Sequence, residues 1–85
     1  LAYQNDTYNQ IIEEIDAVIN EVAKGWKTSR MAKVDLTIMR LAVYEIRYEE
    51  DIPTKVAINE AVEMVKKYGT DTSSSFVNGI LAKIA

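Results

Sequence analysis

The side chains of this sequence that could do chemistry are few, and they do not converge as catalytic groups do. Among its 85 residues there is no Cys and no His, which removes the usual zinc and haem ligands, a thiol nucleophile and every triad that needs histidine. The acidic triplet at 49–51 occupies consecutive positions, whose side chains do not share one face of a helix. A solvated helix end explains it better than a metal or acid–base site. We therefore expect no enzymatic activity and no cofactor.

The other candidates concern phosphates and nucleobases. Gly25, Gly69 and Gly79 stand apart, so the sequence has no glycine-rich phosphate loop. Three serines at 73–75 precede an apolar run, where they could cap a helix or bind a phosphate through backbone N–H groups. Capping is the favoured interpretation unless a basic or aromatic side chain lies nearby. Phe76 follows these serines and fits a core position, but an aromatic ring beside a helix start is also what base stacking needs.

Charge is distributed unevenly along the chain. The net charge is −3, yet residues 24–40 sum to +4, largely through Lys24, Lys27, Arg30 and Lys33. These four cations could contact phosphates, but they give only a weak electrostatic footprint. On composition alone, nucleic-acid binding is a minor hypothesis.

The elements that must position these residues are all predicted to be helices. Apolar residues recur at helical spacing in four stretches, and no stretch alternates as a strand does. The first ends near Gly25, and Asp6 or Thr7 could cap it unless it continues from upstream. The others run from Val34 to about residue 49, from Pro53 to residue 68, and onward from candidate caps at 71–75. We therefore expect an all-α helical bundle with short loops, with Trp26 anchoring the first corner.

Glu45 breaks the pattern of the second helix. The apolar arc of that helix covers about 220°, and Glu45 lies inside it, between Val34 and Ile38 on the helical wheel. A carboxylate there needs hydrogen-bond donors or a cation. We expect backbone donors, Asn59 or a lysine of the neighbouring helix to supply them; the alternative is that Glu45 anchors a polar face used by a partner.

Length and composition predict one small domain over residues 1–85, with a single apolar core. No 18-residue window is free of charge, and the first residues lack the features of a signal peptide, so we expect a cytoplasmic protein. The chain starts at Leu1 rather than at methionine, and we expect it to be a fragment.

Three blocks of the sequence closely resemble the C-terminal part of the NusB transcription antitermination factors. They are VDLTIMRLAVYEI at 34–46, IPTKVAINEAVE at 52–63, and KKYG at 66–69 followed by FVNGIL at 76–81. The resemblance is most secure from Trp26 onward and implies the C-terminal half of the all-helical NusB-like fold. That family usually carries an arginine-rich N-terminal helix, which this chain lacks together with the rest of the N-terminal half. The apolar surface so exposed could drive self-association.

The resemblance implies a bacterial, non-enzymatic factor that binds boxA-type single-stranded RNA in nascent ribosomal RNA. It would act together with NusE, a small ribosomal subunit protein, and keep RNA polymerase elongating. The positions it assigns to RNA are Lys55, Phe76, Asn78 and Thr54. Those it assigns to the protein partner are Asp35, Arg30 and Lys33. Tyr44, Glu45, Asn59 and Glu60 also match the family, and we expect them to hold the fold.

Two alternatives remain at this stage. The same domain resembles the non-catalytic RNA-binding module of some ribosomal RNA cytosine methyltransferases, which would require a catalytic domain downstream. The chain could also be a helical protein-interaction module without any RNA role.

Overall fold

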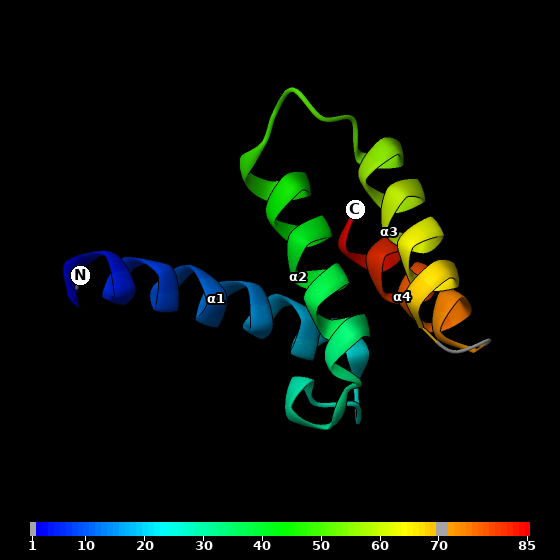
Figure 1. Ribbon diagram of the computed structural model, residues 1–85, viewed down its shortest axis with the longest axis horizontal. Helices are drawn as coiled ribbons and strands as arrows, with labels where there is room; N and C mark the ends of the chain where they lie inside the picture. The colour runs from blue at the N-terminus through cyan, green and yellow to red at the C-terminus, as the bar shows by residue number, and fades with distance from the viewer. Residues whose placement is uncertain (1, 70–71) are drawn as a thin grey trace.

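The part of the chain that the structure describes is built from four α-helices and one short 3-10 turn (Figure 1). The computed structural model describes the backbone of residues 2–69 and 72–85, and the side chains of residues 7–69 and 72–85. In chain order the elements are α1 (Ala2–Ala23), η1 (Thr28–Arg30), α2 (Lys33–Tyr48), α3 (Thr54–Tyr68) and α4 (Ser73–Ile84). The predicted all-α bundle is confirmed. None of the described helices is both long enough and apolar enough to cross a membrane.

The helix boundaries differ from the predicted ones mainly at α1. This helix already begins at Ala2, so positions 6 and 7 lie within it and do not cap it. The side chain of Asp6 is outside the described residues. Asp71, one of the candidate caps of α4, is outside them as well. At the other end, Gly25 adopts a left-handed backbone with φ +86, which favours glycine and turns the chain towards η1. The backbone N–H of Thr28 donates to Asn20 Oδ1 over 2.8 Å and holds η1 against α1.

The core lies where the four helices meet. Its largest fully buried side chains come from every helix: Ile19, Met39, Val43, Val65, Val77 and Leu81. Small residues at the buried positions of α3, Ala57 and Ala61, let this helix approach its neighbours closely. The C-terminal half of α1 packs into this core, whereas its N-terminal half extends away from the other helices (Figure 1).

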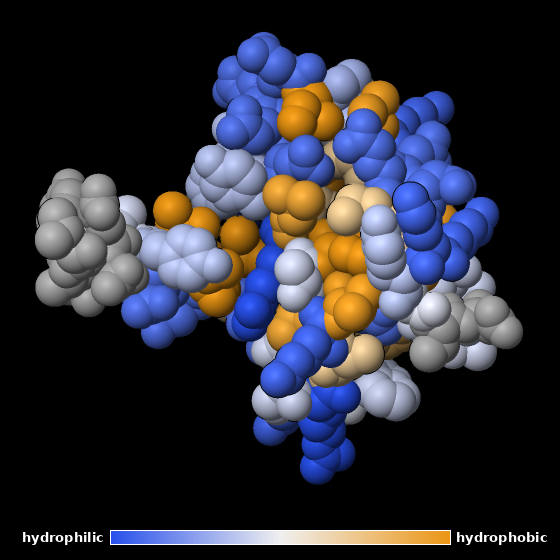
Figure 2. All heavy atoms as spheres, viewed as in Figure 1, coloured by the Kyte–Doolittle hydropathy of each residue, from blue (hydrophilic) through white to orange (hydrophobic). Residues whose placement is uncertain are grey.

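Apolar side chains also remain at the surface. Figure 2 shows them gathered where α1 meets α2 and along the line between α2 and α3. Leu41 of α2 is 49% exposed, and Val34 and Met64 are also exposed. The wide apolar arc of α2 is therefore only partly covered by the other helices.

A buried hydrogen bond joins the start of α2 to the start of α4. Ser73 Oγ donates to Asp35 Oδ2 over 2.9 Å, and both residues are buried. Gly69, at the end of α3, packs against the same carboxylate: a Cβ atom at this position would lie 3.1 Å from Asp35 Oδ1 and 2.8 Å from the carbonyl oxygen of Val65. Three helix ends thus meet at Asp35, and the position after α3 must be glycine for steric reasons.

We predict that Gly69→Ala destabilises the protein by about 1–3 kcal/mol, because the added methyl group has no room beside a backbone carbonyl. The measurement is urea unfolding followed by circular dichroism. The matched control is Gly79→Ala on α4, where a Cβ would meet nothing within 4 Å and where alanine should stabilise the helix by up to about 1 kcal/mol. Equal stability of the Gly69→Ala variant and the parent chain would contradict this packing.

Candidate nucleic-acid interface

Two aromatic rings meet beside the start of α4. Phe76 lies in the first turn of α4 and Trp26 in the corner between α1 and η1; their ring centroids are 5.9 Å apart and the rings are inclined by 69°. Phe76 packs against the core, as favoured, but it is only partly buried and keeps an accessible face. Trp26 holds the corner as predicted, yet it is 58% exposed. An aromatic pair of this kind offers a stacking surface to solvent.

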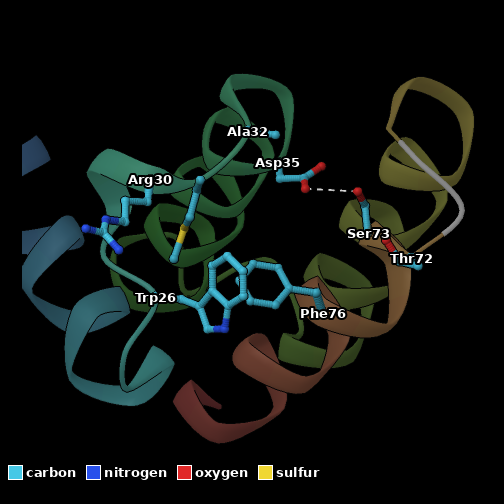
Figure 3. A pocket seen from close by; sticks show the side chains of 8 residues that line it. Trp26, Arg30, Ala32, Asp35, Thr72, Ser73 and Phe76 are labelled. Atoms are coloured by element: carbon cyan, nitrogen blue, oxygen red, sulfur yellow. Dashed lines mark hydrogen bonds between the residues drawn. The ribbon is translucent and has the colours of Figure 1, made fainter.

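The rings form one wall of a pocket of about 310 Å³ (Figure 3). Its lining residues are Trp26, Arg30, Met31, Ala32, Asp35, Thr72, Ser73 and Phe76. Figure 3 shows Arg30 on the side of Trp26, and the Asp35–Ser73 hydrogen bond across the pocket from it. Of the serines at 73–75, Ser73 lines this pocket together with two aromatic rings, and the basic side chain of Arg30 lies on the far side. An aromatic side chain nearby was one of the conditions for assigning these serines more than capping. Flat apolar faces beside a guanidinium group suit an unpaired base and its phosphate.

Asp35 is placed differently from our expectation of a residue facing a protein partner. Its side chain is only 7% exposed, and within the described part of the chain its Oδ1 atom accepts no hydrogen bond. Arg30 is exposed at the pocket rim. Lys33 is exposed as well, but it lines a separate apolar groove with Val34. Of the three residues predicted for partner contact, two are accessible and the third positions Ser73.

The residues predicted to contact RNA are not all brought together. Thr54 and Lys55 lie in the first turn of α3, where both are exposed. This helix has 15 residues, which at 1.5 Å each separates its start by about 20 Å from the end that meets Asp35. These two residues therefore belong to the opposite end of the α3–α4 pair from the aromatic pocket (Figure 1).

Asn78 is exposed, but it points away from the pocket. It is two positions after Phe76 on the same helix, which corresponds to a rotation of about 200°. The block FVNG therefore presents its aromatic ring and its amide on different faces of α4. Residues that are close in the sequence need not lie on the same face of a helix.

Within the described part of the chain, Glu45 has none of the side-chain donors that we predicted. It is half-buried in α2, Asn59 is exposed, and the charged groups that act on Glu45 are Glu60 and Glu49. Desolvation by burial, followed by the repulsion of these two carboxylates, raises the pKa of Glu45 above its ordinary value. Tyr44 is also at the surface, where its ring lies 5.3 Å from that of Tyr48. That Tyr44, Glu45, Asn59 and Glu60 hold the fold stays a prediction.

We predict that Glu45→Gln stabilises the protein at neutral pH. A raised pKa in the folded state means that ionised Glu45 costs stability above that pKa, and this cost disappears as the pH falls towards the ordinary value of 4.5. The stability difference between the variant and the parent chain should therefore be largest near pH 7 and shrink on acidification. Urea unfolding across this pH range measures it, with Glu13→Gln on the exposed face of α1 as the charge-matched control. A stability difference that is absent at pH 7, or that grows as the pH falls, would contradict a raised pKa of Glu45.

Sequence reasoning missed one charged pair that shapes the molecule. Arg40 donates to Asp16 through Nε over 2.8 Å and through Nη2 over 2.7 Å, which links α2 to α1. This bidentate pair raises the pKa of Arg40. The two residues are 24 positions apart, so no local sequence pattern could have found the pair.

The comparisons with known proteins agree on one family. The model of the NusB family matches residues 6–85. The transcription antitermination protein NusB of Agathobacter rectalis is 64% identical over 86 residues, covering 98% of this chain and 66% of the relative. That of Geobacter sp. (strain M21) is 49% identical over 87 residues, covering 99% of this chain and 60% of the relative. Among solved structures, T. maritima NusB superposes with a TM-score of 0.86 at 44% identity, over 91% of this chain and 54% of that one. The chain thus spans between about half and two thirds of the length of these relatives.

Proposed function

Because the chain belongs to the NusB family, we propose that it acts in transcription antitermination by binding boxA-type single-stranded RNA of nascent ribosomal RNA together with NusE. In this role the protein is a non-catalytic platform that works in the cytoplasm beside the elongating RNA polymerase. Binding energy comes from stacking of unpaired bases and from phosphate contacts.

The observation that carries the proposal is the aromatic pocket at the start of α4. Phe76 and Trp26 hold their rings 5.9 Å apart, and Arg30 lies at the rim. A base that stacks on this wall would enter a pocket that Arg30 also lines, so its phosphate would lie on a basic side of the molecule. The Asp35–Ser73 hydrogen bond sets the position of α4 and hence of Phe76.

The remaining predicted residues fit a longer RNA path. Thr54 and Lys55, about 20 Å away at the start of α3, would contact the backbone of a strand that runs along the α3–α4 pair. Asn78, on another exposed face of α4, would contact a neighbouring nucleotide. Lys33 at the start of α2 would meet NusE, and Arg30, in η1 at the rim of the pocket, would lie where the RNA and NusE come together. Asp35 would contribute by holding the local backbone rather than by direct contact.

We predict that Phe76→Ala weakens binding of a labelled boxA-type RNA by about 5- to 150-fold, because one stacked base contributes roughly 1–3 kcal/mol. Fluorescence anisotropy in the presence of NusE, at two salt concentrations, measures the loss. The matched control is Tyr48→Ala, which removes an exposed ring at the far end of α2. If both variants bind like the parent chain, the pocket is not the RNA site.

We predict that Lys55→Glu also weakens this binding and lowers its salt dependence, because one phosphate contact is lost. Arg47→Glu is the control, since it changes the net charge equally from the exposed side of α2. Equal losses for both variants would indicate a general charge effect. Absence of RNA binding by the parent chain with NusE, at either salt concentration, would contradict an RNA role and leave a protein-interaction module.

A further inference from the structure

Basic side chains gather at the corner where α1 ends and α2 begins. Lys24 follows the last residue of α1, and Lys27 precedes η1. Arg30 ends η1, and Lys33 is the first residue of α2. Residues 24–33 include no acidic residue, so this stretch carries a charge of +4 in a chain whose net charge is −3. The proposed function gives a role to Arg30 and Lys33 but none to the two lysines before them. We call Lys24, Lys27 and Arg30 the basic corner.

The cations of the basic corner are exposed, and within the described part of the chain none of them forms an ion pair. Other cations of the protein do: Arg40 is paired with Asp16, and Lys66 Nζ lies 3.6 Å from Glu63 Oε1. Clustered cations repel one another, and a bound anion relieves this repulsion. Another protein segment could bury them only by supplying carboxylates, because an unpaired buried charge is costly. The basic corner therefore suits an anionic ligand.

Hydrogen bonds hold the backbone of the basic corner in place. The N–H of Trp26 donates to the carbonyl oxygen of Ala23 over 3.2 Å, and the N–H of Arg30 donates to that of Lys27 over 2.9 Å. The bond from Thr28 to α1, described above, anchors the segment between them. Binding at this corner thus requires little ordering of the main chain, which favours affinity.

The basic corner is continuous with the aromatic pocket. Trp26 lies between Lys24 and Lys27 in the chain, and Arg30 lines the pocket together with Trp26 (Figure 3). Sites for single-stranded nucleic acids combine aromatic rings, on which bases stack, with cations that follow the phosphates. The corner adds the second of these features to the first.

A strand that stacks at the pocket continues on both sides of it, and the two sides differ in charge. On one side lies α3, which carries the exposed carboxylates of Glu60 and Glu63 between its last turn and Lys55. The acidic triplet at 49–51 precedes the same helix. On the other side, residues 24–33 present cations alone. Phosphates are therefore attracted more strongly to the basic corner than to α3.

We propose that Lys24 and Lys27 bind the phosphates of nucleotides next to the base that stacks at the aromatic pocket. The basic corner then holds one side of the RNA strand, and the two lysines supply part of the salt-dependent share of the affinity. This inference rests on the proposed function, because it concerns the same RNA at the same site.

Fluorescence anisotropy of a labelled boxA-type RNA with the 85-residue chain and NusE, over a series of salt concentrations, tests the proposal. The double variant Lys24→Gln, Lys27→Gln should bind more weakly at low salt and approach the affinity of the parent chain as the salt concentration rises. The slope of the logarithm of the association constant against that of the salt concentration should become less steep by about 1.4, since each phosphate contact of a single strand contributes about 0.7. The change in Trp26 fluorescence at saturating RNA should persist, because the stacking rings are intact. Both lysines are exposed, so the variant should fold, which circular dichroism checks.

The matched control is the double variant Arg47→Gln, Lys66→Gln, which lowers the net charge equally at exposed positions of α2 and α3 outside the corner. It should keep the slope of the parent chain. RNA binding by the parent chain with an unchanged slope in the corner variant overturns this inference and leaves the proposed function standing. Equal flattening in both double variants overturns it as well, because the effect would then be one of net charge. A parent chain that binds no RNA even with NusE overturns the proposed function, and this inference with it.

Discussion

The buried hydrogen bond from Ser73 to Asp35 fixes the end of the bundle at which the candidate site lies. It joins the first turn of α2 to the first turn of α4, two segments separated by 38 positions in the sequence. Because a buried carboxylate without a donor is costly, this contact leaves little freedom to the start of α4. Phe76 follows three residues later, so the orientation of its ring against Trp26 depends on the same contact. Gly69 completes the arrangement, since a larger residue would push α3 away from Asp35.

Periodicity predicted the four helices and most of the core, because burial on one side of a helix leaves a repeating record in the sequence. It did not predict which polar groups are buried. Asp35 reads as an ordinary acidic residue at a helix start, yet it is buried, whereas Glu45 reads as buried and lies beside two other carboxylates. A helical wheel gives the direction of a side chain on its own helix. It does not give the tilt of the neighbouring helix, and that tilt decides whether a hydrogen-bond donor or another carboxylate lies opposite the side chain.

The candidate site was predictable only in part for the same reason. Phe76 and the serines before it were recognised as a possible stacking and phosphate site, but Trp26 and Arg30 reach that site from another element. Conversely, Lys55 and Asn78 were grouped with Phe76 through family resemblance, and the bundle places them at other positions. Family membership indicates which residues matter together in a complex, whereas packing decides which of them meet within one chain.

The aromatic pocket combines two rings with an exposed basic side chain, which is the chemistry that an unpaired nucleotide needs. The central claim, that a base stacks at the aromatic pocket, can be read directly from the intrinsic fluorescence of Trp26, the single tryptophan of the chain. The chain is titrated with boxA-type RNA in the presence of NusE, and binding is followed in parallel by anisotropy. The fluorescence should change in proportion to the RNA bound, and the change at a given RNA concentration should be smaller at high salt. Binding that leaves the fluorescence of Trp26 unchanged would contradict the account.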